Sequence, residues 1–345
     1  MSSEKIKRAN WLELLFDLIF VFAVSKATHI LAHAHDGHMG YEQYITFILV
    51  MIPIWWAWTG HTLFATRFDT EDTAQKLLTL TQMLAVVFWA TFINADFDPN
   101  YQGYLLFYVL IRILLIMMYW RATKYNTASI PVAKKLSTGF SVGLVIVLSS
   151  LLFESPLRYF VMYTGIAIEI LTPILSRKVL KSVPVKSHHL PERYGLLTII
   201  LLGESVIMLA TSLNESQWTE LTVGAAISGF FLLSAIWWLY FNLVEKHLIG
   251  QNLNTGQHVI YGHLFIYSGL SAIAVFIGYS VKPELTLLSH IMLFLTGSVA
   301  LFSGLFFIFG HRAILEKELR IPILIIILSA ATSIFLPLLS AGDIH

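Results

Sequence analysis

The sequence predicts an all-α membrane protein of about eleven transmembrane helices. Of its 345 residues, 57% are hydrophobic and 12% are charged, against a charged fraction of roughly 25% in soluble domains. The mean hydropathy is +0.72. Folding in water requires a polar surface that this composition does not supply, so bilayer lipid is the expected solvent. Apolar runs of roughly 20 residues, the length that crosses a bilayer, also recur along the chain.

Eleven such runs are expected to form the spans. The run at 137–153 is short, and the first run contains Glu13, Asp17 and Lys26, which leaves a tilted or partly reentrant element open at either place. The expected spans are 11–31, 42–64, 76–95, 102–120, 137–153, 157–176, 194–213, 220–244, 258–280, 285–310 and 321–341.

Lys and Arg predict the orientation, because these residues gather in the short cytoplasmic segments of a membrane protein. With the N-terminus inside, eighteen of the 22 fall in cytoplasmic segments, and only Arg158 and Lys282 fall in outer ones. The other two, Lys26 and Arg112, fall within spans. We therefore expect a multi-pass protein of the bacterial plasma (inner) membrane with its N-terminus inside and its C-terminus outside. Acidic residues interrupt the first run, so it is not predicted to be a cleaved signal peptide.

Composition excludes several classes of function. The 22 Lys and Arg residues against 21 Asp and Glu give a net charge of +1, which offers no basic surface for a nucleic acid. The absence of Cys excludes thiol nucleophiles, iron–sulfur clusters and disulfides. No nucleotide-binding, serine-hydrolase or zinc-protease motif occurs. The sequence thus predicts no particular cofactor and no metal site. Membrane lipid is the predicted partner, and a homo-oligomer is left open.

A weak internal repeat links the two halves of the chain. Residues 14–25 align with residues 201–212 at an offset of 187, which places Asp17 opposite Glu204. The Ile-Trp-Trp run at 54–56 recurs further along, at an offset of 182. Ordered matches at a nearly constant offset favour a true repeat over the chance alignment of apolar segments, which stays the alternative.

The repeat predicts how the chain is organised. Residues 1–153 would form the first membrane repeat with helices 1–5, and residues 187–345 the second with helices 7–11. Residues 154–186 would hold the connector helix and a cytoplasmic loop. A shift of six spans preserves orientation, so we expect parallel repeats related by an axis along the membrane normal.

Ionisable residues within the predicted spans are the candidate site. Asp17 lies four residues after Glu13, so both carboxylates share one helix face. Arg112 is deep in its span, where a charge costs at least about 2.5–3.5 kcal/mol unless it is paired or hydrated. Its candidate partners are Asp17, Glu169 and Glu204. Three acids around one Arg would carry a net negative charge that a proton or cation could compensate. The alternative is a set of structural contacts between helices.

Other polar and aromatic residues have more ordinary interpretations. Glu13 is expected either to reach back to the cytoplasmic interface or to cap the first helix near Asn10. Thr28 lies roughly in line with the two acids. A solvated loop is favoured over a metal site for the segment that contains His29, His33, His35, Asp36 and His38. Hydrogen bonds in the core are favoured over haem ligation for His61, His263, His29 and His290. An aromatic belt at the membrane interface is expected for Trp55, Trp56, Trp58, Trp120, Trp237 and Trp238.

Two segments resemble the bacterial low-temperature-requirement A (LtrA) family. One is Trp-Leu-Glu-Leu-Leu-Phe-Asp at 11–17 with its continuation to residue 25, and the other runs from His-Leu-Pro-Glu-Arg at 189–193 to Gly-Glu-Ser at 203–205. Trp-Trp-Leu-Tyr-Phe at 237–241 and Tyr-Gly-His at 261–263 extend the likeness over nearly the whole chain. The resemblance implies a polytopic plasma-membrane protein associated with growth in the cold, and it supplies no substrate. It places five ionisable residues in the family's marked segments: Glu13, Asp17, Glu192, Arg193 and Glu204.

The leading functional hypothesis is a secondary transporter or a proton- or cation-conducting protein, whose substrate is a proton, a cation or a small polar solute. Asp17 and Glu204 would carry the site, with Arg112 as counter-charge and Glu169 as a relay. The supporting residues would be Glu13, Thr28, Ser205, His263, Glu192 and Arg193. A lipid-binding or membrane-organising scaffold is the alternative. An intramembrane enzyme is the third hypothesis, and Ser205 beside Glu204 with no placed His supports it poorly.

Overall fold

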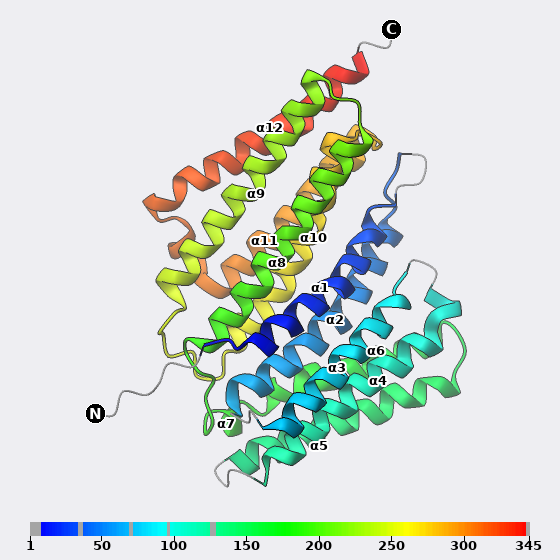
Figure 1. Cartoon of the computed structure of the whole chain (residues 1–345), viewed down its shortest axis with the longest axis vertical. Helices are drawn as coiled ribbons and strands as arrows, with labels where there is room; N and C mark the ends of the chain where they lie inside the picture. The colour runs from blue at the N-terminus through cyan, green and yellow to red at the C-terminus, as the bar shows by residue number, and fades with distance from the viewer. Residues whose placement is uncertain (1–7, 34–36, 69–71, 95–96, 125–128, 343–345) are drawn as a thin grey trace. The chain divides into compact units, whose positions relative to one another are not determined.

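The computed structural model describes residues 8–33, 37–68, 72–94, 97–124 and 129–342 (Figure 1). Over these residues the chain is helical and contains no β-strand. The α-helices are α1 Trp11–Leu31, α2 Tyr41–Arg67, α3 Thr73–Thr91, α4 Phe97–Ala122, α5 Ile130–Ser149, α6 Leu157–Leu175, α7 Arg177–Leu180, α8 His189–Glu215, α9 Glu220–His247, α10 Gln257–Val281, α11 Leu287–Ile314 and α12 Arg320–Gly342.

Every predicted span coincides with one long helix, and α7 is a single additional turn. Among the described residues, ten of the long helices are also long and apolar enough to cross a membrane. The helix outside this set is α3, which carries Gln75, Lys76 and Gln82. The prediction of an all-α chain rich in membrane spans is therefore confirmed, and the composition of α3 is more polar than expected for a span.

Short polar side chains fix where several helices begin. Asp72 precedes α3 and accepts a hydrogen bond from the backbone N–H of Gln75 at 2.8 Å. Arg121 also donates to this carboxylate. These two hydrogen bonds hold the pKa of Asp72 below its ordinary value, with the Gln75 N–H as the larger cause. Thr219 caps α9 in the same way, because its hydroxyl accepts from the N–H of Thr222.

The described helices group into two compact units. The first unit contains residues 8–26, 50–193 and 250–257, and the second contains residues 27–49, 194–249 and 258–342. The helices α3 to α7 thus belong wholly to the first unit, and α9, α11 and α12 to the second. The internal repeat, with boundaries at residues 153 and 187, stays a prediction.

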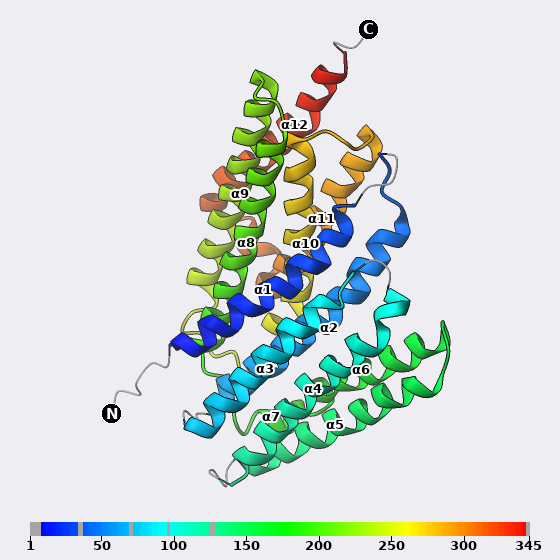
Figure 2. The ribbon, with the colours of Figure 1, turned by 45° about the vertical axis from the view of Figure 1, so that its right-hand side comes forward.

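In the first unit, α3, α4, α5 and α6 pack one against the next (Figure 2). The helices α5 and α6 approach most closely at two glycines. A Cβ atom on Gly143 would lie 2.7 Å from the carbonyl oxygen of Gly165, and a Cβ atom on Gly165 would lie 2.6 Å from that of Gly143. Small residues of this kind allow two backbones to pack tightly inside a membrane.

In the second unit, α9 packs along α12, and α10 crosses α11 at a further pair of glycines. A Cβ atom on Gly304 would lie 2.6 Å from the carbonyl oxygen of Gly262. Buried hydroxyls add hydrogen bonds between helices of this unit, since Ser228 on α9 donates to the carbonyl of Ser329 on α12 at 2.7 Å. Both units thus combine close backbone contact with a few interhelical hydrogen bonds.

The tryptophans divide into a buried and an exposed group. Trp55, Trp56 and Trp58 on α2 are at most 2% exposed, so the prediction of an interface position is wrong for these three. Their indole rings lie within the first unit, where two of them reach buried carboxylates. The other three tryptophans of the predicted belt, Trp120, Trp237 and Trp238, are exposed, as are Trp11 and Trp218. Together with many large apolar side chains on the helix surfaces, they are suited to contact with lipid.

Candidate functional site

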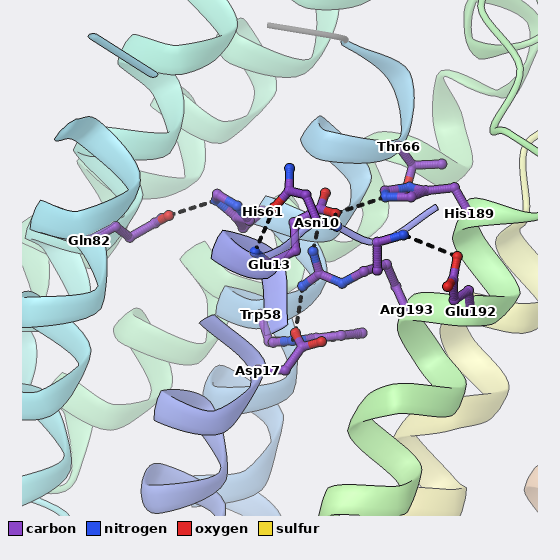
Figure 3. Close-up of polar contacts among 11 residues, drawn as sticks. Asn10, Glu13, Asp17, Trp58, His61, Thr66, Gln82, His189, Glu192 and Arg193 are labelled. Atoms are coloured by element: carbon purple, nitrogen blue, oxygen red, sulfur yellow. Dashed lines mark hydrogen bonds and ion pairs between the residues drawn. The ribbon is translucent and has the colours of Figure 1, made fainter. Parts of the chain in front are cut away.

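Four buried ionisable side chains meet in the first unit, and we call Glu13, Asp17, His189 and Arg193 the α1–α8 cluster (Figure 3). Arg193 Nη2 lies 2.5 Å from Asp17 Oδ1, and its Nη1 lies 3.3 Å from Glu13 Oε1. His189 Nε2 lies 3.1 Å from Glu13 Oε2. Three of these residues are completely buried and Glu13 is 5% exposed. One guanidinium is thus shared between two carboxylates.

The spacing of the sequence explains how the α1–α8 cluster forms. Glu13 and Asp17 are four residues apart on α1, and His189 and Arg193 are four apart on α8. In each helix this spacing aligns the two side chains on one face. Figure 3 shows the two faces turned toward each other, with Arg193 reaching from α8 to α1.

Asn10 and Glu13 form a capping box at the start of α1. Glu13 Oε2 accepts from the backbone N–H of Asn10 at 2.9 Å, and Asn10 Oδ1 accepts from the N–H of Glu13 at 2.9 Å. The predicted capping role of Glu13 is therefore confirmed. Glu192 also holds this end of the chain, because its Oε2 accepts from the N–H of Ala9 at 3.1 Å. Glu13 thus combines a structural role with membership of the cluster.

The helix α2 supplies the surroundings of the cluster. Trp58 Nε1–H donates to Asp17 Oδ1 at 2.8 Å, and the Arg193 guanidinium lies 5.8 Å from the centre of the Trp58 ring. Thr66 Oγ1 lies 3.2 Å from His189 Nδ1. The second oxygen of Asp17, Oδ2, is buried without a hydrogen-bond partner among the described residues. The site therefore keeps an acceptor that a proton, a water or a cation could occupy.

The formal charge of the α1–α8 cluster depends on the protonation of His189. Two carboxylates and one guanidinium sum to −1 when His189 is neutral, and to zero when His189 carries a proton. An uncompensated charge is costly in a buried place. The cluster can therefore exchange a proton or a cation to become neutral, which is the chemistry that the sequence led us to expect around Arg112.

A cavity of about 500 Å³ opens beside the cluster, between the starts of α1 and α3 and the end of α2. Glu13 and His61 both line it. Apolar side chains form most of the remaining wall, with a few polar groups near the start of α3. The other lining residues are Asn10, Trp11, Leu12, Leu15, Phe64, Ala65, Phe68, Gln75, Lys76, Thr79 and Leu80.

The hydrogen bonds of Gln82 fix the tautomer of His61. The amide nitrogen of Gln82 donates to the carbonyl of Ile111 at 3.0 Å, so its oxygen faces His61 Nδ1 at 2.8 Å and accepts a hydrogen bond from its N–H. The ring nitrogen Nε2 of His61 is then the acceptor. Phe16 covers one face of the ring, with 4.0 Å between the ring centres.

A second buried ion pair lies elsewhere in the first unit, and we call Arg112 and Glu169 the α4–α6 pair. Arg112 Nε lies 2.9 Å from Glu169 Oε2. The same oxygen accepts from Trp56 Nε1 at 3.1 Å and from the Tyr108 hydroxyl at 3.0 Å. Gly60 on α2 leaves room for the guanidinium, since a Cβ atom there would lie 2.6 Å from Arg112 Nη1.

The structure assigns different partners from those expected for a single cluster around Arg112. Glu169 does pair with Arg112, as predicted. Asp17 pairs with Arg193 instead, so the prediction that Asp17 shares the Arg112 site is wrong. Arg193 was expected only as a supporting residue, Trp58 was expected in the interface belt, and His189 was not among the predicted site residues. The four-residue spacing of His189 and Arg193, which matches that of Glu13 and Asp17, is the signal that could have identified them.

The remaining candidates belong to the second unit, and all of them are buried. The hydroxyl of Tyr240 donates to His263 Nε2 at 2.8 Å, and His263 Nδ1–H donates to the carbonyl of Val259 at 2.6 Å. The prediction that His263 is a hydrogen-bonded core residue is therefore confirmed. The other three, with no more than 3% exposure each, are Thr28, Glu204 and Ser205. A shared site of Asp17 and Glu204 stays a prediction.

The histidine-rich segment after α1 is only partly described. His35 and Asp36 lie outside the described residues, and His33 Nδ1 lies 2.6 Å from the carbonyl oxygen of His29. Within the described part of the chain, no group of three or more His, Asp or Glu residues is placed to hold a metal ion.

These helices define the chain as a multi-pass helical membrane protein. Residues 8–343 match the family described as bacterial low temperature requirement A protein (LtrA), and the chain belongs to this family. It is similar to the uncharacterized protein RA0937 of Rhizobium meliloti (strain 1021), with 23% identity over 283 residues. That match covers 78% of this chain and 68% of the other protein. The family resemblance of the sequence is thus confirmed.

Proposed function

We propose that this member of the LtrA family is a secondary transporter or a proton- or cation-conducting protein of the bacterial plasma membrane. The observation that carries the proposal is that two buried carboxylates share one guanidinium in the α1–α8 cluster, which gives a formal charge of −1 when His189 is neutral. Ionisable residues inside a membrane protein are functional candidates by default. A purely structural contact is more stable when its charges cancel, as they do in the α4–α6 pair.

The proposed coupling step is the uptake of one proton by the cluster. Protonated, His189 forms a charged pair with Glu13; deprotonated, it forms an ordinary hydrogen bond through the same Nε2 atom. The contact between the start of α1 and the start of α8 is therefore stronger in the proton-loaded state. A transporter needs this kind of difference, because an ion shifts a conformational equilibrium only through its differential affinity for the two states.

The residues take revised roles in this proposal. Arg193, not Arg112, is the counter-charge of Asp17, and the cavity lined by Glu13 gives access to the cluster. We keep Glu204 as the candidate acid of the second repeat, within the proposed arrangement of parallel repeats and an inside N-terminus. The link to growth at low temperature, which the family's description carries, belongs to the same proposal.

Proton flux in proteoliposomes tests the proposal. An imposed pH gradient should drive flux through the native chain, and Asp17→Asn and His189→Gln should each lower it at least about tenfold, because each removes a titrating or charge-balancing group. His263→Gln is the matched control, since it alters an equally buried, hydrogen-bonded histidine of the second unit. Thermal unfolding in detergent confirms that each variant is folded. Full flux in a folded Asp17→Asn protein would refute the proposal.

A non-transporting, lipid-binding scaffold is the second candidate function. The observation that favours it is the cavity beside α1, whose wall is mostly apolar and includes the 87% exposed Trp11. A scaffold requires the fold and not the charge of Asp17. Complementation separates the two candidates: in a strain that lacks the gene, a folded Asp17→Asn protein should restore growth in the cold if the protein is a scaffold, and should fail if it is a transporter.

A further inference from the structure

The cavity beside α1 has the size and lining of a binding site for an organic molecule. Its volume of about 500 Å³ falls within the range of roughly 300–1,000 Å³ found for small-molecule sites. Such sites combine mostly apolar walls with a few polar groups that orient the ligand. The chemistry of those polar groups decides which ligand class fits.

Two of the residues that line the cavity, Glu13 and His61, carry hydrogen-bond acceptors. In neutral His61, Nδ1–H donates to Gln82, so Nε2 is the acceptor. One face of the ring is covered by Phe16. Glu13 contributes a carboxylate. Its Oε1 lies 3.3 Å from Arg193 Nη1, and this contact is an ion pair without a hydrogen bond. The lining thus offers two acceptors, and a ligand with a donor group could satisfy them.

The charge behind the cavity favours a cation. Glu13 belongs to the α1–α8 cluster, whose formal charge is −1 when His189 is neutral, and the balancing Arg193 is completely buried. Lys76 is the positive residue of the lining; it lies in the first turn of α3 and is exposed. A cationic group near Glu13 would therefore be attracted to the cluster and repelled weakly by Lys76 through solvent.

The apolar part of the wall continues to the outer surface of the helices. Trp11, Leu15 and Leu80 line the cavity and are 87%, 43% and 44% exposed. Phe64 and Phe68 form the buried part of the wall. A ligand with an apolar body could therefore lie along this wall and enter from the lipid-facing surface.

We propose that the cavity binds a lipophilic primary ammonium ion. The ammonium group donates hydrogen bonds to His61 Nε2 and Glu13 Oε1, and the apolar body packs along Trp11, Leu15 and Phe64. This inference deepens the proposed function by naming the substrate class of the same site: an organic cation whose charge compensates the cluster as a proton would. It rests on the proposed function for the transport step but not for binding.

Calorimetry on the purified full-length protein in detergent tests the inference, with hexylammonium as the probe and hexanol and hexanoate as matched compounds. Hexylammonium should bind at one saturable site. Hexanol, which keeps a donor and lacks the charge, should bind about tenfold more weakly, equivalent to about 1.4 kcal/mol. Hexanoate should not compete. Similar binding of all three compounds would overturn the inference, because lipid-like filling of the cavity would explain it.

Variants locate the binding site. Ala65→Phe should fill the cavity and weaken hexylammonium binding more than about tenfold; Leu15→Trp is the second variant if the first does not fold. The control is Ser141→Phe in the groove between α4 and α5, which has a similar volume of about 510 Å³ and no ionisable lining residue. Binding that survives both cavity variants, or that Ser141→Phe removes, would contradict the inference.

Two more measurements separate this inference from the proposed function. Lys76→Gln should tighten hexylammonium binding about twofold by removing a repulsive surface charge, and a weakening would indicate an anionic ligand instead. His189→Gln should lose proton flux and keep hexylammonium binding. Proton flux without any hexylammonium binding would support the proposed function and contradict this inference. Hexylammonium binding without proton flux in the native protein would support this inference and contradict the proposed function.

Discussion

The two buried ion clusters of the first unit share a local design and differ in charge. In each, an indole N–H of α2 donates to a carboxylate that also pairs with an arginine: Trp58 to Asp17 in the α1–α8 cluster, and Trp56 to Glu169 in the α4–α6 pair. Each guanidinium also lies near its indole ring, at 5.8 Å and 5.7 Å from the ring centre. The geometry of one triad is thus repeated two residues further along the same helix.

The charges and the surroundings separate the two clusters. The α4–α6 pair is neutral, and its arginine also faces Phe140 at 4.8 Å. The α1–α8 cluster holds one more carboxylate and a histidine, and it borders the cavity through Glu13. A neutral ion pair among aromatic rings suits a structural contact, whereas an unbalanced cluster beside a cavity suits the binding of an exchangeable ion. The comparison predicts which cluster each variant should affect.

The largest expected effect is that of removing the shared arginine. Arg193→Gln leaves two buried carboxylates without a counter-charge, whereas Arg112→Gln leaves one. Breaking a buried pair costs about 3–5 kcal/mol, so we expect Arg112→Gln to fall in this range and Arg193→Gln to exceed it. Thermal or denaturant unfolding in detergent measures both. An equal loss for the two variants would show that Glu13 draws no support from Arg193, and would remove the main difference between the clusters.

A double-mutant cycle should sharpen the same comparison. Removing both charges of the α4–α6 pair, as in Arg112→Met with Glu169→Gln, should restore most of the stability lost in the single variants, because a neutral pair can be replaced by neutral side chains. Arg193→Met with Asp17→Asn should restore less, because Glu13 keeps its charge. A coupling energy of about 1–3 kcal/mol is expected for the first cycle. Full rescue in the second cycle would indicate that Glu13 is neutral or compensated by His189.

The sequence predicted the helices better than their contacts. Hydropathy is a local property, so the centre of every long helix lies within a predicted span. The face shared by Glu13 and Asp17 also followed from local spacing. The choice of Arg193 over Arg112 as the partner of Asp17 depends on which helices pack together, and no single sequence states that packing. The same limit explains two buried tryptophans of α2: tryptophan suits an interface belt, but carboxylates from other helices hold Trp56 and Trp58 in the core.

The tryptophans should show a smaller and unequal effect. Trp58→Phe and Trp56→Phe each remove one hydrogen bond to a charged group, for which a loss of about 1.5–3 kcal/mol is typical. Glu169 Oε2 keeps the Tyr108 hydroxyl at 3.0 Å after Trp56→Phe, so that variant should lie near the lower limit.

Unfolding in detergent measures the two tryptophan variants together, and proton flux supplies a second comparison. Trp58→Phe should also change flux, because it alters the hydrogen bonding of Asp17, while Trp56→Phe should not. A change in flux for Trp56→Phe alone would move the functional assignment to the α4–α6 pair.

The smallest effect is expected at an exposed ion pair, which gives the reference for both buried clusters. Asp72 precedes α3, accepts from Arg121, and is 42% exposed at its side chain. Asp72→Asn keeps a good N-cap residue and removes only the charge. The pKa of Asp72 is lower in the folded state than in the unfolded chain. Its ionised form therefore adds stability above the unfolded pKa of about 3.9. This stability is lost as the pH falls through the folded-state pKa. The native chain should therefore be slightly more stable than Asp72→Asn at pH 7, and this difference should disappear at an acid pH below the folded-state pKa of Asp72. High salt should also remove the difference, since the pair is exposed. Unfolding at both pH values and two salt concentrations measures this.

The effects of Arg193→Gln and Arg112→Gln on stability should persist in high salt, because the carboxylates that lose their counter-charge are buried. A salt-sensitive loss of stability in either variant would indicate that water already reaches that cluster.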